Sequence, residues 1–345
     1  MSSAPVILRL GSIRYAQEAW ANVEKKYNVL AIESDMTREK FLKELKEPNG
    51  RFSTIKVISR TYESIALTGR FDEEIANALP KSVKAVCHHG AGYDQIDVEP
   101  LRKLQIQVSH TPGAVDGPTA TTHVFLLLGA MRNYSIGSHN LHHGLWPGNG
   151  SGATAPIGRD PSGTVVGIIG LGGIGRAIAQ RLQPFGFKRI VYHNRERLDP
   201  KLEYGCEFVS FDELLKVSDV ISISIPLNKS THHMINKEVF EKMKDGVCLV
   251  NTARGAVINE ADLIEALKSG KVRTAGLDVF EFEPEVPSEL IKMPQVLDLP
   301  HMGTYTVEAV KGIEEKCICN VVSYLETGRV ANLVFEEKDD DWVGK

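Results

Sequence analysis

A glycine-rich segment in the middle of the chain has the spacing of a nucleotide-binding loop. Gly170-Leu171-Gly172-Gly173-Ile174-Gly175 matches the pattern G-x-G-x-x-G, directly follows the apolar run Val165–Ile169 and opens a helical stretch, Ile174–Leu182. Glycines at these positions let the backbone approach a pyrophosphate, whose charge then lies against the free N–H groups at the start of the helix. We therefore expect a dinucleotide to bind here, although a tight βα turn without a ligand has the same pattern.

The end of the next predicted strand bears on the choice between NAD and NADP. NAD-selective sites usually place a carboxylate there, about 20 residues beyond the first glycines, to bind the ribose 2′-hydroxyl. This chain has Asn194 and Arg195, followed by Glu196 and Arg197. Because a guanidinium can neutralise a 2′-phosphate, the sequence favours NADP(H), with NAD(H) possible. In the alternative, both arginines are solvated surface charges and Glu196 binds the hydroxyl.

Three further blocks follow in order: Asn251-Thr252-Ala253-Arg254-Gly255, Gly276-Leu277-Asp278-Val279-Phe280 with Glu283-Pro284, and Pro300-His301-Met302-Gly303. Together with Gly170–Gly175 they resemble the successive signatures of the D-isomer-specific 2-hydroxyacid dehydrogenases, and most of all those of the glyoxylate/hydroxypyruvate reductases. The order of the blocks and the flanking halves, which fit that family's split catalytic domain, extend the resemblance over nearly the whole chain.

The resemblance implies an NAD(P)-dependent enzyme that reduces a small 2-oxo acid to a D-2-hydroxy acid, with glyoxylate and hydroxypyruvate as the leading substrates. One alternative is a reductase of bulkier branched or aromatic 2-oxo acids. Another is a non-catalytic, nucleotide-sensing regulator, because a fold by itself does not imply catalysis.

The resemblance also assigns the catalytic roles to Arg254, Glu283 and His301. Reduction of a 2-oxo acid requires a cation for the carboxylate and the ketone oxygen, a proton donor, and a nicotinamide beside the carbonyl carbon. Arg254 follows the predicted strand Val247–Asn251 and so lies at the carboxyl end of the sheet, where ligands of open α/β folds bind. His301 titrates near neutrality, and a nearby carboxylate favours its protonated form.

Glu281 is a rival to Glu283 as the partner of His301. In an extended segment, residues two apart face the same side, so the choice depends on where the chain turns. Only family spacing and Pro284 favour Glu283. Taken singly, each of these residues has an ordinary structural alternative, such as a surface ion pair or a turn.

The remaining cofactor and substrate contacts follow from the same resemblance. Gly90-Ala91-Gly92-Tyr93-Asp94 follows the predicted strand Val83–Cys87, and the free N–H groups of Ala91 and Gly92 would bind the substrate carboxylate together with Arg254 and His301. The expected cofactor-binding residues are Gly170, Gly172, Gly173, Ile174, Gly175, Asn194, Arg195, Pro226, Thr252, Arg254, Asp278, His301 and Gly303.

Other polar residues near these blocks receive no catalytic role. Arg60 is expected either to face the substrate cleft or to lie on the surface, and His88 and His89 are expected to be structural. Thr121 stands where many relatives have an acidic residue, so we assign no catalytic acid there. No metal site is expected, because the cysteines are scattered and Cys317-Ile-Cys319 lacks the spacer of a zinc half-site.

Two series of alternating apolar runs and helical patterns position these residues, and such alternation predicts βαβ units around parallel sheets. A long apolar helix from Pro118, ending by Asn133, separates the series, and residues 144–163 are expected to form a loop or arm. Ser210 and Glu213 form a capping box, Thr306–Leu325 has helical spacing that ends at Gly328, and the acidic tail Glu336–Asp341 is expected to be solvated. The strand candidates are Val6–Leu10, Ile55–Ser59, Val83–Cys87, Ile106–Val108, Val165–Ile169, Arg189–His193, Val220–Ile225, Val247–Asn251 and Thr274–Leu277.

Composition limits the class of protein. Of the 345 residues, 42% are hydrophobic and 24% are charged. These proportions are typical of a globular chain, and the length is enough for about two domains. A formal net charge of −4 offers no basic field for nucleic acid or anionic lipid. The odd number of cysteines, five, and the absence of a signal sequence or a membrane-spanning apolar stretch indicate a cytoplasmic protein.

We therefore expect an α/β protein with two Rossmann-like or flavodoxin-like domains, each with a parallel sheet. Residues 1–116 and 305–345 form a discontinuous substrate-binding domain, residues 117–304 form the dinucleotide-binding Rossmann domain, and the substrate binds between them. The resemblance implies a homodimer formed through the apolar helix and the following arm, with Trp146 near the neighbouring subunit's site.

Overall fold

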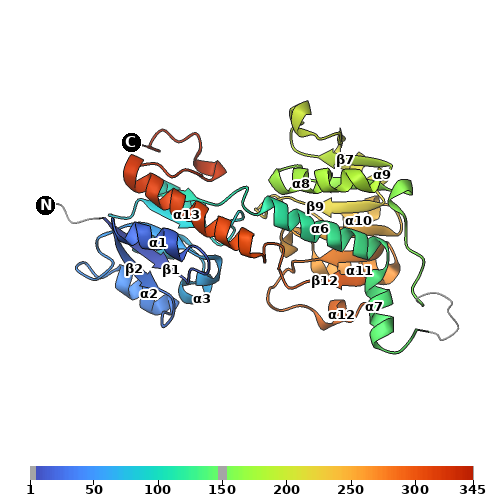
Figure 1. The fold of residues 1–345 in the computed structure, drawn as a ribbon, viewed down its shortest axis with the longest axis horizontal. Coiled ribbons are helices and arrows are strands. Elements are labelled where there is room, and N and C mark those ends of the chain that lie inside the picture. Colours follow the sequence, from blue (N-terminus) through green and yellow to red (C-terminus); the bar gives the residue numbers. More distant parts are fainter. Residues whose placement is uncertain (1–4, 147–153, 345) are drawn as a thin grey trace. The chain divides into compact units, whose positions relative to one another are not determined.

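The computed structural model describes residues 5–146 and 154–344, which form two compact units (Figure 1). The first unit comprises Met1–Val115 and Tyr305–Lys345, and the second comprises Asp116–Thr304. Each unit is built on a parallel sheet, which confirms the predicted α/β class.

The sheet of the first unit has the strand order β2-β1-β3-β4-β5. Apolar side chains alternate between its two faces, as the pleat requires: Leu8 and Ile58 face the cluster that contains Phe41, whereas Ile7 and Val57 face α1 and α13. The strands are β1 (Val6–Leu10), β2 (Asn28–Ile32), β3 (Ile55–Arg60), β4 (Ala85–His88) and β5 (Gln107–Ser109). The helices are α1 (Gln17–Glu24), α2 (Arg38–Leu45), α3 (Ile65–Thr68), α4 (Glu73–Ala78), α5 (Val98–Lys103) and α13 (Val307–Thr327), with 3-10 turns at Tyr62–Ser64 and Phe335–Glu337.

The sheet of the second unit has the order β12-β11-β10-β9-β6-β7-β8, so the direction of the winding reverses between β6 and β9. In doubly wound sheets, ligands bind outside the carboxyl ends of the strands at such a reversal. The strands are β6 (Val165–Ile169), β7 (Arg189–His193), β8 (Glu207–Phe208), β9 (Val220–Ile223), β10 (Val247–Asn251), β11 (Val272–Leu277) and β12 (Val296–Asp298). The helices are α6 (Asp116–Met131), α7 (Tyr134–His142), α8 (Gly173–Leu182), α9 (Phe211–Val217), α10 (Lys237–Lys242), α11 (Glu260–Ser269) and α12 (Ser288–Ile291), with 3-10 turns at Pro161–Gly163, Gln183–Phe185, Pro200–Leu202 and Gly255–Val257.

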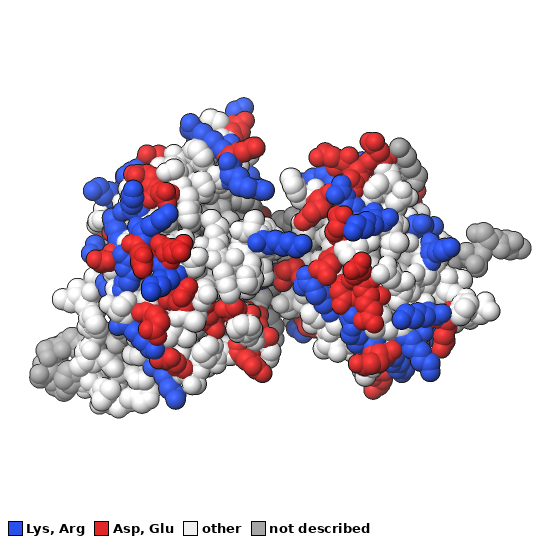
Figure 2. Space-filling model, turned by 180° about the vertical axis from the view of Figure 1, so that it is seen from behind, with Lys and Arg blue, Asp and Glu red and all other residues white. Residues whose placement is uncertain are grey.

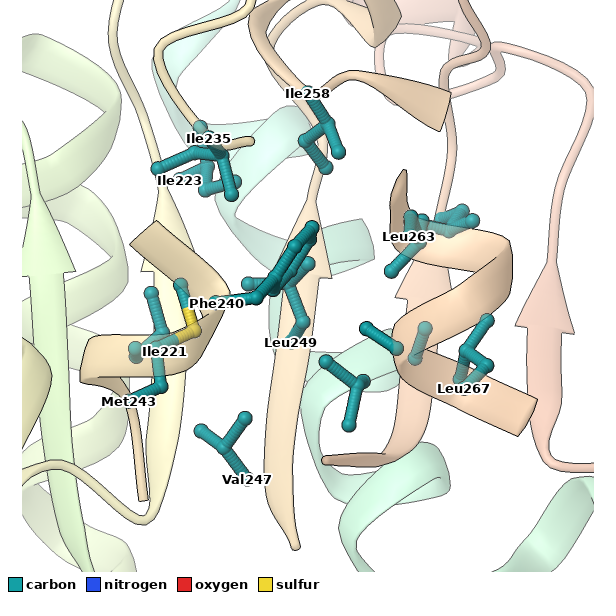
Figure 3. Close-up of a cluster of buried hydrophobic side chains, with 14 of the residues drawn as sticks. Ile221, Ile223, Ile235, Phe240, Met243, Val247, Leu249, Ile258, Leu263 and Leu267 are labelled. Atoms are coloured by element: carbon teal, nitrogen blue, oxygen red, sulfur yellow. The ribbon is translucent and has the colours of Figure 1, made fainter. Parts of the chain in front are cut away.

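Two apolar layers cover this second sheet. Phe240 of α10 and Leu263 of α11 pack with Leu249 of β10 on one face (Figure 3). On the other face, Leu126 of α6 and Ile178 of α8 belong to a second buried cluster. Because α6 buries residues on several of its faces, it is the buried connecting helix that its composition predicts.

The local sequence patterns gave ranges for four helices, those that became α6, α8, α9 and α13, but none for α1–α5, α7 or α10–α12. Strands β2, β8 and β12 were not predicted. All three missed strands are edge strands. β8 and β12 are only 2 and 3 residues long, whereas β2 contains the apolar run Val29–Ile32, a signal that the sequence analysis missed. Helix α7 buries none of its residues and therefore carries little apolar periodicity.

The surface carries both signs of charge. On the face shown in Figure 2, basic and acidic side chains are intermixed over each unit. Among the described helices, none combines the length and the apolarity that crossing a membrane requires. The part of the predicted arm at residues 147–153 lies outside the described residues.

The acidic tail is solvated only in part. Glu336, Asp339 and Asp341 are exposed, as expected. Glu337 has no exposed surface, and its Oε2 accepts a 2.8 Å hydrogen bond from the Val108 N–H of β5. Asp340 accepts two hydrogen bonds from Arg102. For Glu337 the expectation was wrong, because an acidic composition does not show which carboxyl group the backbone of an edge strand will bind.

This buried carboxyl predicts a pH-dependent stability. Burial, with the nearby charges of Asp340 and Glu336, raises the pKa of Glu337 to about 8. The native state therefore keeps a proton that the unfolded chain releases, so stability falls as pH rises through this pKa. The glutamine of Glu337→Gln cannot ionise, so the variant lacks this pH dependence. The free energy of unfolding of the wild type minus that of the variant should therefore decrease by a few kcal/mol between about pH 5 and 8.5. Urea titrations at both pH values measure this difference, and a constant difference would contradict it.

Candidate active site

A histidine–carboxylate pair lies beyond the carboxyl end of the second unit's sheet. His301 Nδ1 is 2.6 Å from Glu283 Oε2, and the two side chains are 30% and 28% exposed, respectively. Burial raises the pKa of Glu283, but the hydrogen bond and charge of His301, with the Phe280 N–H and the charge of Arg254, bring it below its usual value. Glu283 therefore stays ionised at neutral pH and holds the imidazole through Nδ1.

The backbone around His301 is held in an unusual conformation. His301 has a φ of 51°, and its N–H donates to the carbonyl of Asp278 at 2.8 Å. The carboxylate of Asp278 accepts from the N–H groups of Met302 at 2.7 Å and Gly303 at 2.8 Å. A Cβ at position 303 would lie 2.9 Å from Asp278 Oδ2, so glycine leaves the space that this contact needs. Asp278, expected to contact the cofactor, is thus an internal anchor for the His301 turn.

Arg254 lies just beyond β10, on a turn that Asn251 holds. The Asn251 Nδ2 donates to the Arg254 carbonyl at 2.9 Å, and its Oδ1 accepts from the Ala253 N–H at 3.0 Å. A Cβ at Gly255 would lie 1.9 Å from the carbonyl carbon of Phe280, so only glycine permits this close packing. The charge of Arg254 contributes to lowering the pKa of Glu283. Arg254, Glu283 and His301 therefore follow three neighbouring strands, β10, β11 and β12.

The rival glutamate has a different partner. Glu281 Oε1 is 2.7 Å from His233 Nε2, so the two glutamates contact two different histidines. The donor atoms of His232, His233 and Glu281 lie within 4.8 Å of one another, a spacing compatible with a metal ion, which the sequence did not indicate. The hydrogen bond between His233 and Glu281 already satisfies two of these groups.

The glycine-rich turn has the shape that a pyrophosphate requires. Gly170 has a φ of 95°, and a Cβ there would lie 2.5 Å from the Ser224 carbonyl oxygen. A Cβ at Gly175 would lie 2.1 Å from the Gly170 carbonyl oxygen. At Gly172, the N-cap of α8, nothing lies within 4 Å of a Cβ position, and no side chain caps the helix. The turn is therefore tightly packed at Gly170 and Gly175 and open at Gly172, where a phosphate would meet the N-terminus of α8.

The residues after β7 divide into engaged and exposed side chains. Asn194 Oδ1 accepts from the Leu171 N–H at 2.7 Å and so holds the glycine-rich turn. Arg197 pairs with Glu203, with Nε and Oε1 2.7 Å apart. Arg195 is exposed and takes part in none of the hydrogen bonds or ion pairs found between the described residues. Of the two arginines considered for the 2′-phosphate, Arg197 is already paired with Glu203, whereas Arg195 has no such partner among the described residues.

A buried histidine that sequence reasoning missed links three elements of this unit. His123 of α6 contacts Thr252 Oγ1 through Nδ1 at 2.8 Å and Ser222 Oγ through Nε2 at 2.7 Å. Burial lowers the pKa of His123 to about 3, so the ring is neutral. A histidine within an otherwise apolar helix requires internal partners, and this was the signal available in the sequence. Thr252, an expected cofactor contact, is thereby fixed beyond β10, while Pro226 lies on the loop after β9.

In the first unit, the loop Gly90–Asp94 directs its carbonyl groups into the protein. The Gly90 carbonyl accepts from the Thr111 N–H at 2.9 Å, the Ala91 carbonyl from His110 Nδ1 at 2.8 Å, and the Gly92 carbonyl from His88 Nε2 at 3.1 Å. Among the described residues, none accepts a hydrogen bond from the N–H groups of Ala91 or Gly92. Adjacent unpaired N–H groups are the arrangement that binds a carboxylate.

The expectation for Arg60 was wrong. Its side chain has no exposed surface, and burial lowers its pKa to about 10. Its Nη2 donates to Gln95 Oε1 at 2.8 Å, and its guanidinium lies 5.0 Å from the ring centroid of Phe71. Arg60 therefore lies in the interior of the first unit, where its Nε and Nη1 have no hydrogen-bond partner among the described residues. His89 is buried beside Ser59, and Thr121 donates to the Gly117 carbonyl, which leaves both outside the proposed chemistry.

Comparison with known proteins places this geometry in a family. Residues 124–303 match the model of the D-isomer specific 2-hydroxyacid dehydrogenase, NAD binding domain. Glyoxylate reductase 1 of Saccharomyces cerevisiae is 54% identical over 342 residues, which cover 99% of this chain and 98% of the relative. The 4-methyl-2-oxopentanoate reductase A of Aspergillus oryzae is 46% identical, covering 97% of this chain and 99% of the relative.

Solved structures show the same similarity. A glyoxylate reductase from Paecilomyes thermophila aligns with a TM-score of 0.92 and 43% identity, covering 98% of this chain and 100% of that one. An NADPH-dependent glyoxylate/hydroxypyruvate reductase from Sinorhizobium meliloti, solved with NADP and malonate, aligns with a TM-score of 0.81 and 28% identity, covering 97% and 98% of the two chains.

Proposed function

The chain belongs to the D-isomer specific 2-hydroxyacid dehydrogenases, and we propose that it is a reductase of glyoxylate and hydroxypyruvate that prefers NADPH. The observation that carries this proposal is the 2.6 Å contact between His301 and Glu283, on the same side of the sheet as Arg254. This set supplies an acid, its orienting carboxylate and a cation, which are the groups that reduction of a 2-oxo acid requires. The product is the achiral 2-hydroxy acid glycolate from glyoxylate, and a D-2-hydroxy acid from hydroxypyruvate.

Each residue of the set has a distinct part in the reaction. Bound NADPH supplies the hydride that forms the new C–H bond at the carbonyl carbon. Arg254 binds the substrate carboxylate and polarises the carbonyl oxygen, while the N–H groups of Ala91 and Gly92 bind the same carboxylate. His301 gives the proton from Nε2 to the carbonyl oxygen, because its Nδ1 is held by Glu283. The hydride at carbon and the proton at oxygen together convert the carbonyl group into the alcohol of the 2-hydroxy acid.

A bulkier, branched 2-oxo acid is the second candidate for the preferred substrate. The observation that supports it is the 46% identity to a 4-methyl-2-oxopentanoate reductase. We expect kcat/KM, measured by the loss of NADPH absorbance at 340 nm, to be highest with glyoxylate or hydroxypyruvate. A value about tenfold higher with 4-methyl-2-oxopentanoate would select the alternative, and no turnover with any of the three acids would reject the proposed function.

The acid–base pair predicts a loss of turnover when its charge is removed. Because the pKa of Glu283 lies below its usual value, the carboxylate is ionised in the assay and orients the imidazole through Nδ1. Glu283→Gln keeps the shape but removes this charge, so reductive kcat should fall by about a hundredfold, the scale of a positioned general acid, with KM for NADPH little changed. Glu281→Gln is the matched control and should leave kcat near that of the wild type, because Glu281 contacts His233; the reverse result would identify Glu281 as the partner.

Arg195 is proposed to bind the 2′-phosphate of NADPH. Arg195→Ala should lower kcat/KM for NADPH by about ten- to a hundredfold and leave the value for NADH nearly unchanged, because one charge-assisted contact contributes roughly 1.5–3 kcal/mol. Arg197→Ala removes the same charge, but Glu203 already holds that guanidinium, so its effect on NADPH should be clearly smaller. Equal losses with both cofactors in Arg195→Ala would contradict the assignment.

The protein is further proposed to be a cytoplasmic homodimer. Helix α7 buries none of its residues, and Phe125, Tyr134, Leu141 and Trp146 are all more than half exposed, which is unusual for large apolar side chains unless a partner covers them. The five cysteines are free, as expected in a reducing compartment. Light scattering at micromolar concentration should give twice 38.0 kDa. A monomeric mass would contradict the dimer, and unchanged kinetics in Trp146→Ala would contradict a role of Trp146 in the neighbouring site.

A further inference from the structure

We infer that residues 333–340, named here the C-terminal segment, position the substrate loop Gly90–Asp94, with Tyr93, His110 and Glu336 as the positioning residues. The inference rests on the proposed function, in which Ala91 and Gly92 bind the substrate carboxylate. It gives the C-terminal segment a part in substrate affinity, although the segment is remote from the loop in the chain.

The C-terminal segment is attached to β5, at the edge of the first unit's sheet. Leu333 forms an antiparallel bridge with Ser109, and the Val334 N–H donates to the Val108 carbonyl at 3.0 Å. The buried carboxyl group of Glu337 accepts from the Val108 N–H at 2.8 Å. The segment is therefore held by backbone and side-chain contacts on both sides of position 336.

Three contacts connect this segment and His110, the residue after β5, to the substrate loop. The Tyr93 hydroxyl donates to Glu336 Oε2 at 2.8 Å, and burial with this carboxylate raises the pKa of Tyr93, so the phenol remains a donor. The ring of Tyr93 lies edge-on to His110, with centroids 5.3 Å apart. His110 in turn donates from Nδ1 to the Ala91 carbonyl at 2.8 Å. Burial lowers the pKa of His110, so the ring is neutral at pH 7.

These contacts set the direction of the peptide groups that meet the substrate. Because the carbonyl of Ala91 is tied to His110, the planar peptide group between Ala91 and Gly92 directs its N–H the other way. Loss of the Tyr93–Glu336 hydrogen bond frees the side chain that packs on His110 and lets this peptide rotate. Binding of the substrate carboxylate then weakens. The chemical step is unaffected, because Arg254, Glu283 and His301 belong to the second unit.

The test compares variants that remove or keep this one hydrogen bond. Tyr93→Phe and Glu336→Ala should each raise KM for glyoxylate by about five- to tenfold, the effect of one lost hydrogen bond, with kcat and KM for NADPH within about twofold of the wild type. The Tyr93 hydroxyl also accepts from the Phe335 N–H, so Tyr93→Phe removes both contacts and Glu336→Ala removes one. The double variant should therefore be no worse than Tyr93→Phe alone. Glu336→Gln keeps an acceptor and should restore a KM near that of the wild type.

Asp339→Ala is the matched control, because Asp339 is an exposed acidic residue of the same segment and makes none of the hydrogen bonds or ion pairs found between described residues. It should leave KM unchanged. An unchanged KM in Tyr93→Phe and Glu336→Ala, or an equal rise in Asp339→Ala, would overturn the inference. The inference would also be overturned if Tyr93→Phe and Glu336→Ala lowered NADPH affinity or thermal stability together with substrate affinity, and Glu336→Gln did not restore these properties.

Hydrogen–deuterium exchange separates this inference from the proposed function. The amides of Gly90 and Thr111 are hydrogen-bonded between the loop and the residues after β5, the first to Thr111 Oγ1 at 3.0 Å and the second to the Gly90 carbonyl at 2.9 Å. These two amides should exchange faster in Tyr93→Phe and Glu336→Ala than in the wild type or Asp339→Ala, whether or not a 2-oxo acid is turned over. Faster exchange combined with no wild-type activity on any 2-oxo acid would reject the proposed function while supporting the positioning of the loop. Unchanged exchange would reject the positioning itself.

Discussion

Parallel alignment of β10, β11 and β12 is the constraint on which the geometry of the second unit depends. Parallel strands present their carboxyl ends at one edge of a sheet, so the turns that follow them are neighbours in space although they are distant in the chain. Arg254 follows β10, Glu283 follows β11 and His301 follows β12. The hydrogen bond between His301 and Glu283 exists because two of these turns meet, and its short distance reflects an ionised carboxylate against an imidazole.

Buried polar groups then hold these turns in place. The carboxylate of Asp278 accepts from two backbone N–H groups next to His301, and the neutral ring of His123 joins Ser222 to Thr252. A buried polar atom without a partner is costly, so each of these side chains restricts its neighbours to the few conformations that satisfy it. Asp278 and His123 therefore hold the site in place through hydrogen bonds inside the protein, and this role does not require contact with substrate or cofactor.

The two units present backbone N–H groups to anions in different ways. In the second unit, the start of α8 is left without a side-chain cap, and the glycine at position 172 leaves space above it. In the first unit, the carbonyl groups of Gly90, Ala91 and Gly92 are engaged by internal donors, which turns the N–H groups of Ala91 and Gly92 outward. One arrangement comes from helix geometry and suits a pyrophosphate, whereas the other comes from hydrogen bonds with other parts of the unit and suits a carboxylate.

The sequence by itself determined the α/β class, the strands that are buried on both faces, and the residue types at the site. The runs that became β1, β6, β7 and β10 have their predicted bounds, because a fully buried parallel strand is apolar at nearly every position. Only the tertiary structure decided the short edge strands β8 and β12, the partner of each histidine and the burial of Glu337. Glu281 and Glu283 are equivalent in an extended segment, and Glu337 resembles any solvated acid, until the fold brings His233, His301 and the Val108 N–H beside them. Local patterns report burial and chain direction, but a hydrogen bond between residues far apart in the chain depends on which elements pack together.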